Sequence, residues 1–146
     1  MMSTATSAVV VTACEVRHGI GPGFAVAFAP DERRVAHMRK ITEAHLRLWR
    51  VPEPTAENVI LAVSELVTNG IQHGHCAMRL NALCRDGVLR FEVTDGNPSP
   101  AQLSQADDDD LSGRGLFAVA ALARDWGVSD DGYTTWCDFR LSSGRP

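Results

Sequence analysis

The chain contains 146 residues, of which 45% are hydrophobic and 22% charged, a composition that excludes wholesale disorder and a fibrous repeat. A chain of this length is typical of one ordinary domain, which can bury a hydrophobic core without disulfides or structural metals. Its 14 basic and 18 acidic residues give a net charge of -4. This acidic balance argues against a protein that coats nucleic acid or an anionic membrane.

The N-terminal residues and the cysteines indicate where the domain begins and where the protein resides. The four cysteines form no Cys-x-x-Cys pair, and neither a secretory signal nor a membrane-spanning run is readable. We therefore expect reduced thiols in a cytoplasmic protein. Residues 1–22 are small and interrupted by glycine, which predicts a flexible extension with one short strand around Val9–Val11. The domain itself is expected to span residues 23–146.

The hydrophobic pattern predicts a strand and two helices in the first half of the domain. The strand covers Phe24–Ala29 and ends before Pro30. A first helix begins at Asp31 and stops near Pro52. Its apolar face is expected to contain the residues at three-to-four spacing, namely Val35, Met38, Ile41, His45 and Leu48. A second helix begins at Pro54 and Thr55 and runs to about His73.

Strands dominate the second half. Alternating runs over 76–84 and 89–95 flank Arg85-Asp86-Gly87, which is a hairpin turn signal. Residues 97–113 form a long loop, an apolar helix covers Gly115–Trp126, and a last strand covers 135–141. Hairpin-linked strands with grouped helices predict an α+β fold. We expect a two-layer sandwich with a mixed, mostly antiparallel sheet on one side and helices on the other.

A polar stripe on the second predicted helix is the first candidate site. Glu65, Asn69 and His73 recur every four residues, so successive members lie about 40° apart around the helix axis. The adjacent arc of the helix is apolar and is expected to face the core; it contains Val59, Val63, Leu66 and Val67. The stripe therefore lies where the core borders a cleft. The alternative is an ordinary solvated helix face.

Two further segments carry polar or glycine-rich signals. Asp95 continues the alternation of the core-facing residues of its strand, and a carboxylate directed at the core needs a partner. The alternative is an aspartate that caps a turn. Gly113-Arg114-Gly115-Leu116 reads as a glycine-rich turn that opens a helix, where free N–H groups and the helix dipole favour phosphate. Neither a Walker nor a Rossmann glycine motif occurs in the sequence.

Taken in order, these segments resemble the N, G1 and G2 boxes of the superfamily that unites gyrase, heat-shock chaperone, histidine kinase and mismatch-repair ATPases. Residues 65–74 (ELVTNGIQHG) resemble the N box, Asp95-Gly96-Asn97-Pro98 the G1 box and Gly113-Arg114-Gly115-Leu116 the G2 box. Residues 122–128 (LARDWGV) are similar to the stand-alone anti-sigma-factor serine/threonine kinase branch. The resemblance covers about residues 24–141 and implies a Bergerat-type, histidine-kinase-like ATP-binding domain.

The resemblance implies a role for each matching position. Glu65 would be the general base that accepts the proton of an attacking serine hydroxyl, and Asn69 would coordinate a Mg²⁺ ion that bridges the phosphates. Asp95 would bind the adenine amino group, and residues 97–113 would form the ATP lid. The implied ATP-binding set is Asn69, His73, Asp95, Gly96, Gly113, Arg114, Gly115 and Leu116.

The resemblance also implies a biological role. The chain would be a cytoplasmic, Mg²⁺- and ATP-dependent serine/threonine-protein kinase that phosphorylates an anti-sigma-factor antagonist and sequesters a sigma factor. Transcription would then be regulated with no direct DNA binding and no membrane contact, and the protein could form a homodimer.

The sequence departs from the family pattern at two places, and the second departure favours an alternative function. Gly96 follows Asp95 directly, whereas the family often has one residue between them, and no basic residue precedes Gly113, although Arg114 could substitute. The alternative is an ATP-sensing partner-switch module that binds a partner without phosphotransfer. A nucleotide-free structural domain is a third interpretation, which requires that the three boxes occur by chance.

Overall fold

A computed structural model describes residues 10–14, 22–73, 76–95 and 111–141. The predictions that fall on Gly96 and on residues 97–110 lie outside these ranges. In chain order the elements are β1 (Val10–Cys14), β2 (Gly23–Phe28), α1 (Arg33–Leu48), α2 (Glu53–His73), β3 (Met78–Arg85), β4 (Val88–Thr94), α3 (Leu111–Leu122), β5 (Asp125–Val128) and β6 (Thr134–Arg140).

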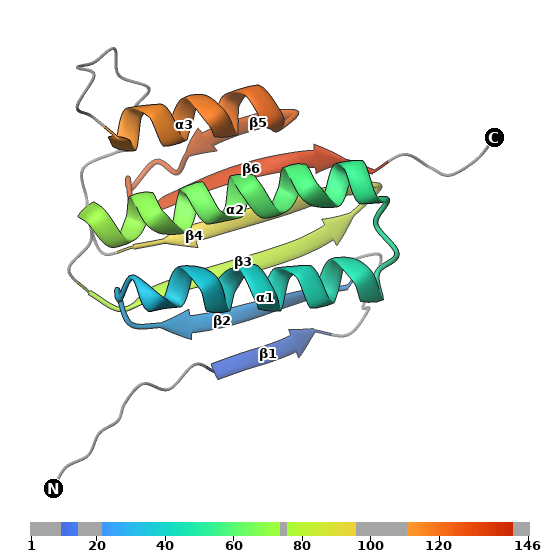
Figure 1. Cartoon of the computed structure of the whole chain (residues 1–146), viewed down its shortest axis with the longest axis horizontal. Helices are drawn as coiled ribbons and strands as arrows, with labels where there is room; N and C mark the ends of the chain where they lie inside the picture. The colour runs from blue at the N-terminus through green and yellow to red at the C-terminus, as the bar shows by residue number, and fades with distance from the viewer. Residues whose placement is uncertain (1–9, 15–21, 74–75, 96–110, 142–146) are drawn as a thin grey trace, which may run out of the picture.

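The strands form one six-stranded sheet in the order β1-β2-β3-β4-β6-β5. The three helices lie side by side over one face of this sheet, with α2 between α1 and α3 (Figure 1). The predicted two-layer α+β sandwich is therefore confirmed. Each neighbouring pair of described strands is antiparallel, so the parallel pairing that a mixed sheet would contain is not found among them.

The core lies between the sheet and the helices, because alternate residues of β2, β3, β4 and β6 are buried beneath the helices. The expected inward faces of β4 and β6 are both confirmed. The apolar arc predicted on α2 is buried as well. The residues concerned are Leu89, Phe91 and Val93 on β4, Cys137 and Phe139 on β6, and Val59, Val63, Leu66 and Val67 on α2.

The hairpin between β3 and β4 follows directly from its two turn residues. Arg85 pairs with Val88, so that only Asp86 and Gly87 form the loop. Both have positive φ angles, 51° and 77°. This is the conformation of a type I′ turn, whose twist matches that of the flanking strands and which favours an Asp-Gly sequence.

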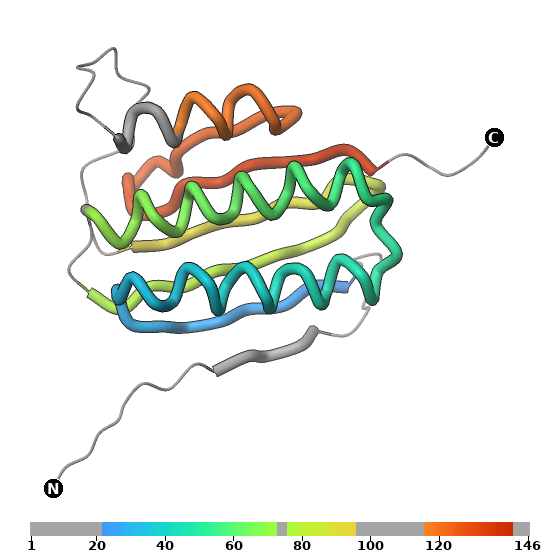
Figure 2. The backbone as a smooth tube through the Cα atoms, in the orientation of Figure 1, coloured from blue at the N-terminus to red at the C-terminus, as the bar shows by residue number. Residues whose placement is uncertain are grey.

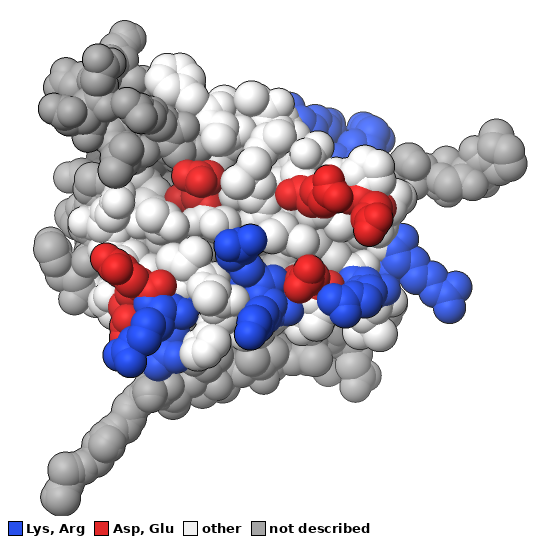
Figure 3. Space-filling model, in the orientation of Figure 1, with Lys and Arg blue, Asp and Glu red and all other residues white. Residues whose placement is uncertain are grey.

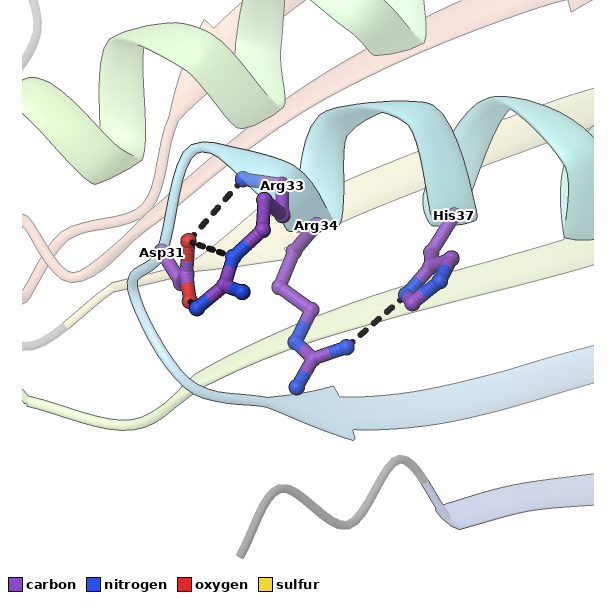
Figure 4. A network of polar contacts seen from close by, with 4 residues as sticks. All are labelled: Asp31, Arg33, Arg34 and His37. Atoms are coloured by element: carbon purple, nitrogen blue, oxygen red, sulfur yellow. Dashed lines mark hydrogen bonds and ion pairs between the residues drawn. The ribbon is translucent and has the colours of Figure 1, made fainter.

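Helix α1 begins with a polar network (Figure 4). The Asp31 carboxylate accepts hydrogen bonds from the backbone N–H of Arg33 at 3.0 Å and from its guanidinium at 3.1 Å. These bonds, the side-chain one first, hold the pKa of Asp31 below its usual value. One turn further on, the Arg34 guanidinium donates to Nδ1 of His37 at 2.9 Å. The helix thus begins two residues later than the sequence predicts, with Glu32 as N-cap, and the Asp31 carboxylate binds its first N–H group.

The face that α1 presents to the core agrees with the expected one at Val35, Met38 and Ile41 and differs from it at Leu48. Leu48 is 73% exposed, whereas Met38, Thr42 and Leu46 are buried. The buried row recurs strictly every four residues, and this row packs onto the sheet beside α2. The prediction that Leu48 belongs to the core is therefore wrong, because an exposed leucine can share the spacing of a buried one near a helix end.

The ends of α3 also differ from the sequence prediction. The helix begins at Leu111, so Gly113 and Gly115 lie inside it and do not form a turn ahead of it. It ends at Leu122, and Asp125 and Trp126 belong to β5. Strand pairing of β5 with β6, which places Trp126 opposite Cys137, decides this boundary against the apolar run that favoured a longer helix.

Strand β1 adds one edge strand to the sheet. It runs over Val10–Cys14, longer than the strand expected around Val9–Val11, and pairs with β2 from Val10 opposite Ala27 to Cys14 opposite Gly23. Part of the segment predicted as a flexible extension thus pairs with the domain.

The backbone trace shows that α1 and α2 run antiparallel to each other over the sheet (Figure 2).

Candidate functional site

The polar stripe of α2 lies on the side of that helix that borders α3. Ile60 lines a hollow against α1, and the nine residues from Ile60 to Asn69 turn the helix by about 180° net. Asn69 therefore faces away from α1, and Glu65, one turn earlier, is near it on the same side. Asn69 is buried, with 9% of its surface exposed, and Glu65 is half-buried. The stripe is thus not a solvated helix face.

Asp95 is positioned by the last ladder interactions of β4. It follows the inward-facing residues Phe91 and Val93 at the same parity. Its backbone N–H donates to the Tyr133 carbonyl at 3.0 Å. Beside it, the hydroxyl groups of Thr94 and Thr134 are hydrogen-bonded at 2.8 Å across the two strands. The backbone at Asp95 is therefore held by β6, and its side chain is on the helical side of the sheet.

Gly70 is the point where the stripe and Asp95 meet. A Cβ atom at Gly70 would lie 3.5 Å from Oδ2 of Asp95, 3.5 Å from Val93 and only 2.5 Å from the methyl group of Met78. A side chain at Gly70 would thus collide with Met78, whereas its distance to Asp95 would be an ordinary van der Waals contact. Since Gly70 directly follows Asn69, Asp95 at the end of β4 lies close to the α2 backbone one residue away from Asn69.

Two residues of this region were not among the predicted site residues. Gly70 was part of the quoted motif, and its signal was a glycine inside a helix, which normally needs a packing reason. Thr135 is buried on the inward face of β6, opposite Val93. The sequence feature that could have identified Thr135 is a hydroxyl-bearing residue among the otherwise apolar inward-facing residues of β6. Both lie beside Asp95, and we add them to the candidate site.

The segment predicted as the phosphate-binding turn is the first part of α3. An α-helix leaves the N–H groups of its N-cap and of its first three residues without intrahelical acceptors, and in α3 these three residues are 111–113. Gly113 is among them, whereas Arg114, Gly115 and Leu116 come after them. The side chain of Leu116 is 1% exposed and belongs to the core. The start of the helix, and not a separate glycine turn, is therefore the feature that can bind an anion.

Three of the predicted site residues lie wholly or partly outside the description. Gly96 lies outside the described residues. His73 is the last residue of α2, which places its backbone one turn beyond Asn69, and its side chain lies outside the description, as does the side chain of Arg114. The sequence assignment of these three residues to the ATP-binding set stays a prediction.

The donor atoms present suit a magnesium ion held jointly with phosphate. Among the described residues, no group of three or more His, Cys, Asp or Glu side chains could hold a metal ion by itself. The amide oxygen of Asn69 and the carboxylate of Glu65 are hard oxygen donors, and Mg²⁺ is usually bound by one or two such groups with substrate phosphates and water. Asn69 would hold the ion, which would neutralise phosphate charge.

The comparison with known families agrees with this arrangement. No curated protein sequence matches the chain, and no helix in the described part of it is long and apolar enough to cross a bilayer. Residues 28–139 match the histidine kinase-like ATPase domain. This segment includes α1, α2 and α3 and thus both Asn69 and Asp95. The chain therefore belongs to the histidine kinase-like ATPase domain family, a family of ATP-binding domains.

Proposed function

We propose that this ATPase domain is a regulatory serine/threonine-protein kinase of the anti-sigma-factor type, acting in the cytoplasm with Mg²⁺–ATP as phosphate donor. The observation that carries the proposal is the close approach of Asp95 to Gly70, the residue next to Asn69, inside the segment that matches the family. An amide that can bind a metal ion, close to a half-buried carboxylate, suits a bound nucleotide, with phosphates at α2 and adenine at the end of β4.

The proposed reaction uses the residues of α2 and α3 in separate roles. The serine hydroxyl oxygen of the substrate attacks the γ-phosphorus, the bond to the bridging β–γ oxygen breaks, and ADP leaves. Glu65 accepts the hydroxyl proton. The carboxylate of Asp95 accepts a hydrogen bond from the adenine amino group, and the N–H groups at the start of α3 bind phosphate oxygen. Such a transfer depends mainly on positioning and on charge neutralisation.

The proposed substrate is an anti-sigma-factor antagonist, and the proposed regulatory partner is a sigma factor that the protein sequesters. The resemblance of residues 122–128 (LARDWGV) to the anti-sigma-factor kinase branch supports these partners. The net charge of -4 agrees with control of transcription without direct contact to DNA. A homodimer belongs to the same proposal.

The test separates nucleotide binding from phosphotransfer. Calorimetry measures the affinity for Mg²⁺–ATP, and transfer of labelled γ-phosphate to a purified antagonist protein measures catalysis. Glu65→Gln should lose transfer and keep ATP affinity, whereas Asp95→Ala should lose both. Glu92→Gln, a half-buried carboxylate on the opposite face of the sheet, is the matched control and should keep both.

A second candidate function is favoured by one feature of the sequence. No basic residue precedes Gly113 at positions 111 and 112, so a positive charge that would stabilise the transferred phosphoryl group is missing there. The alternative is an ATP-sensing partner-switch module that changes its affinity for a partner without phosphotransfer. If the parent protein binds ATP and transfers no phosphate to any antagonist, the kinase proposal is wrong and this module is the remaining function. If the parent binds no ATP, both fail.

A further inference from the structure

A groove runs along the boundary between α1 and α2, on the side of α2 opposite to the candidate nucleotide site. It consists of two hollows of about 520 and 240 Å³ that share Glu43 and Ile60. The apolar residues of its lining, here called the floor, are Ala36, Leu46, Val51, Ala56 and Ile60, and the rest of the lining is charged. The hollows are lined by α1 residues from Ala36 to Arg47, which is about 17 Å at 1.5 Å per residue, and by Arg50 and Val51 beyond the end of α1.

Arg50, at the end of this groove, has a backbone conformation that normally belongs to glycine. Its φ angle is 59°. Its N–H donates to the Arg47 carbonyl at 3.0 Å, and the N–H of Val51 donates to the Leu46 carbonyl at 2.9 Å. These bonds form a Schellman motif, in which glycine is the usual residue at the left-handed position. An arginine here is strained, and such strain is concentrated where a side chain has a function.

The two walls of the groove carry opposite charges. The wall formed by α1 and the residues just after it is mainly basic, and Glu43 is its one acidic lining residue. The first two turns of α2 are acidic (Figure 3). The basic residues are Arg39, Lys40, Arg47 and Arg50, and the acidic residues of α2 are Glu53 and Glu57. Glu43 and Arg47 are paired at 3.8 Å in an exposed contact, which is easily exchanged for a contact with a partner.

We propose that this groove binds an amphipathic α-helix of a protein partner. The helix would place an apolar row on the floor, acidic side chains against the α1 wall and basic side chains against the α2 wall, with Arg50 held in its strained conformation to contact a partner carboxylate. The part of the groove along α1 corresponds to about eleven helical residues, and a helix of about fourteen residues would also reach Arg50. Grooves between helices commonly bind such segments through residues at three-to-four spacing.

The groove is separate from the candidate nucleotide site. Ile60, Glu53 and Glu57 face α1, whereas Asn69 is on the opposite side of α2, about 180° away around its axis. Partner binding in the groove can therefore be tested without a change in the residues proposed to bind ATP.

The test uses a synthetic helical peptide of about fourteen residues with leucines on one face, glutamates on one flank and lysines on the other. Amide chemical shifts of the ¹⁵N-labelled full chain are followed during titration. Saturable shifts are expected at Arg47, Arg50, Ala56 and Ile60, with weaker binding at higher salt. Shifts elsewhere only, or none, would refute the proposal. A peptide with serine in place of leucine should not bind.

Two substitutions of one residue distinguish a binding role of Arg50 from a structural one. Arg50→Gly relieves the left-handed strain and should raise Tm by about 3 °C, yet weaken peptide binding about fivefold. Arg50→Ala removes the guanidinium and keeps the strain, so it should weaken binding to the same extent without raising Tm. If both variants bind the peptide as the parent does, Arg50 has no role in docking.

A matched control and a separate assay complete the design. Arg85→Glu reverses an exposed charge beside the β3–β4 turn and should bind the peptide as the parent does, whereas Arg47→Glu should not. Mg²⁺–ATP affinity, measured in parallel, should be the same in all Arg50 variants. If the parent protein does not bind Mg²⁺–ATP, the proposed function is wrong, whereas the groove proposal is still decided by the peptide titration.

Discussion

Replacing Gly70 with alanine tests whether close packing at this residue holds Asp95 in a position to bind nucleotide. The added Cβ would lie 2.5 Å from the methyl group of Met78, whereas carbon atoms pack best at about 3.5–4.0 Å. The methyl group must therefore move by about 1 Å. Overpacking of this kind costs about 1–3 kcal/mol, and alanine in place of glycine in a helix returns about 1 kcal/mol.

The net loss of stability is therefore about 1 kcal/mol, which corresponds to a fall in Tm of about 3 °C for a domain of this size. The effect on nucleotide binding should be larger. The new Cβ would lie 3.5 Å from Oδ2 of Asp95, in contact with the carboxylate that is proposed to bind adenine. Loss of one hydrogen bond to a charged group costs about 1.5–3 kcal/mol, which raises the Kd for ATP about 10- to 100-fold.

Calorimetric titration with Mg²⁺–ATP and a thermal melt on the same sample measure both quantities. Gly127→Ala is the matched control, because its Cβ would lie 2.7 Å from the Trp136 ring on the opposite face of the sheet. It should lower Tm and leave the Kd unchanged. A Gly70→Ala variant that loses stability but binds ATP with the affinity of the parent would refute the idea that packing at Gly70 positions Asp95.

Three further predictions concern stability. Gly87→Ala should lower the free energy of unfolding, measured by denaturant titration, by about 1 kcal/mol, because its φ is 77° and no atom lies within 4 Å of the added Cβ to offset the strain by packing. An unchanged free energy of unfolding would argue against the type I′ turn. Arg90 donates to Asp138 from Nε at 2.7 Å and from Nη2 at 3.0 Å, and 40% of the Arg90 side chain and 11% of the Asp138 side chain are exposed. A double-mutant cycle to alanine should therefore give a coupling energy of about 1 kcal/mol. If the two substitutions are additive, the pair contributes nothing to stability. Burial raises the pKa of the Cys137 thiol from 9.0 to about 12, so the native state keeps a proton that the unfolded state releases. The parent should therefore lose about 1.4 kcal/mol per pH unit above pH 9 relative to Cys137→Val, measured by urea unfolding, and parallel pH profiles would contradict this reasoning.

Much of the fold could be predicted from local patterns because they act over a few residues. The Asp86-Gly87 turn, the hydrogen bond of Asp31 to the first N–H of α1 and the alternation of β4 depend on neighbouring residues alone. The polar stripe of α2 was visible from its four-residue spacing. The roles proposed for Glu65 and Asn69, by contrast, came from a resemblance, and they stay predictions until they are measured.

Other features depended on partners far away in the sequence. Trp126 belongs to a strand because β6 offers it an antiparallel neighbour, and a local apolar run cannot reveal that neighbour. Leu48 is exposed although its spacing suggested a core residue, because the sheet selects the row that contains Met38 and Leu46.

Patterns among residues close along the chain were enough to predict most elements, the inward faces of α2 and β4 and the three motifs that suggest an ATP site, but not β5. Only the tertiary structure decided that Asp95 lies against Gly70 and that Arg50 closes a groove between two helices. Both depend on how closely α2 approaches another element. That distance is set by packing across the whole core, because a residue's contacts with distant segments are fixed only when the layers come together.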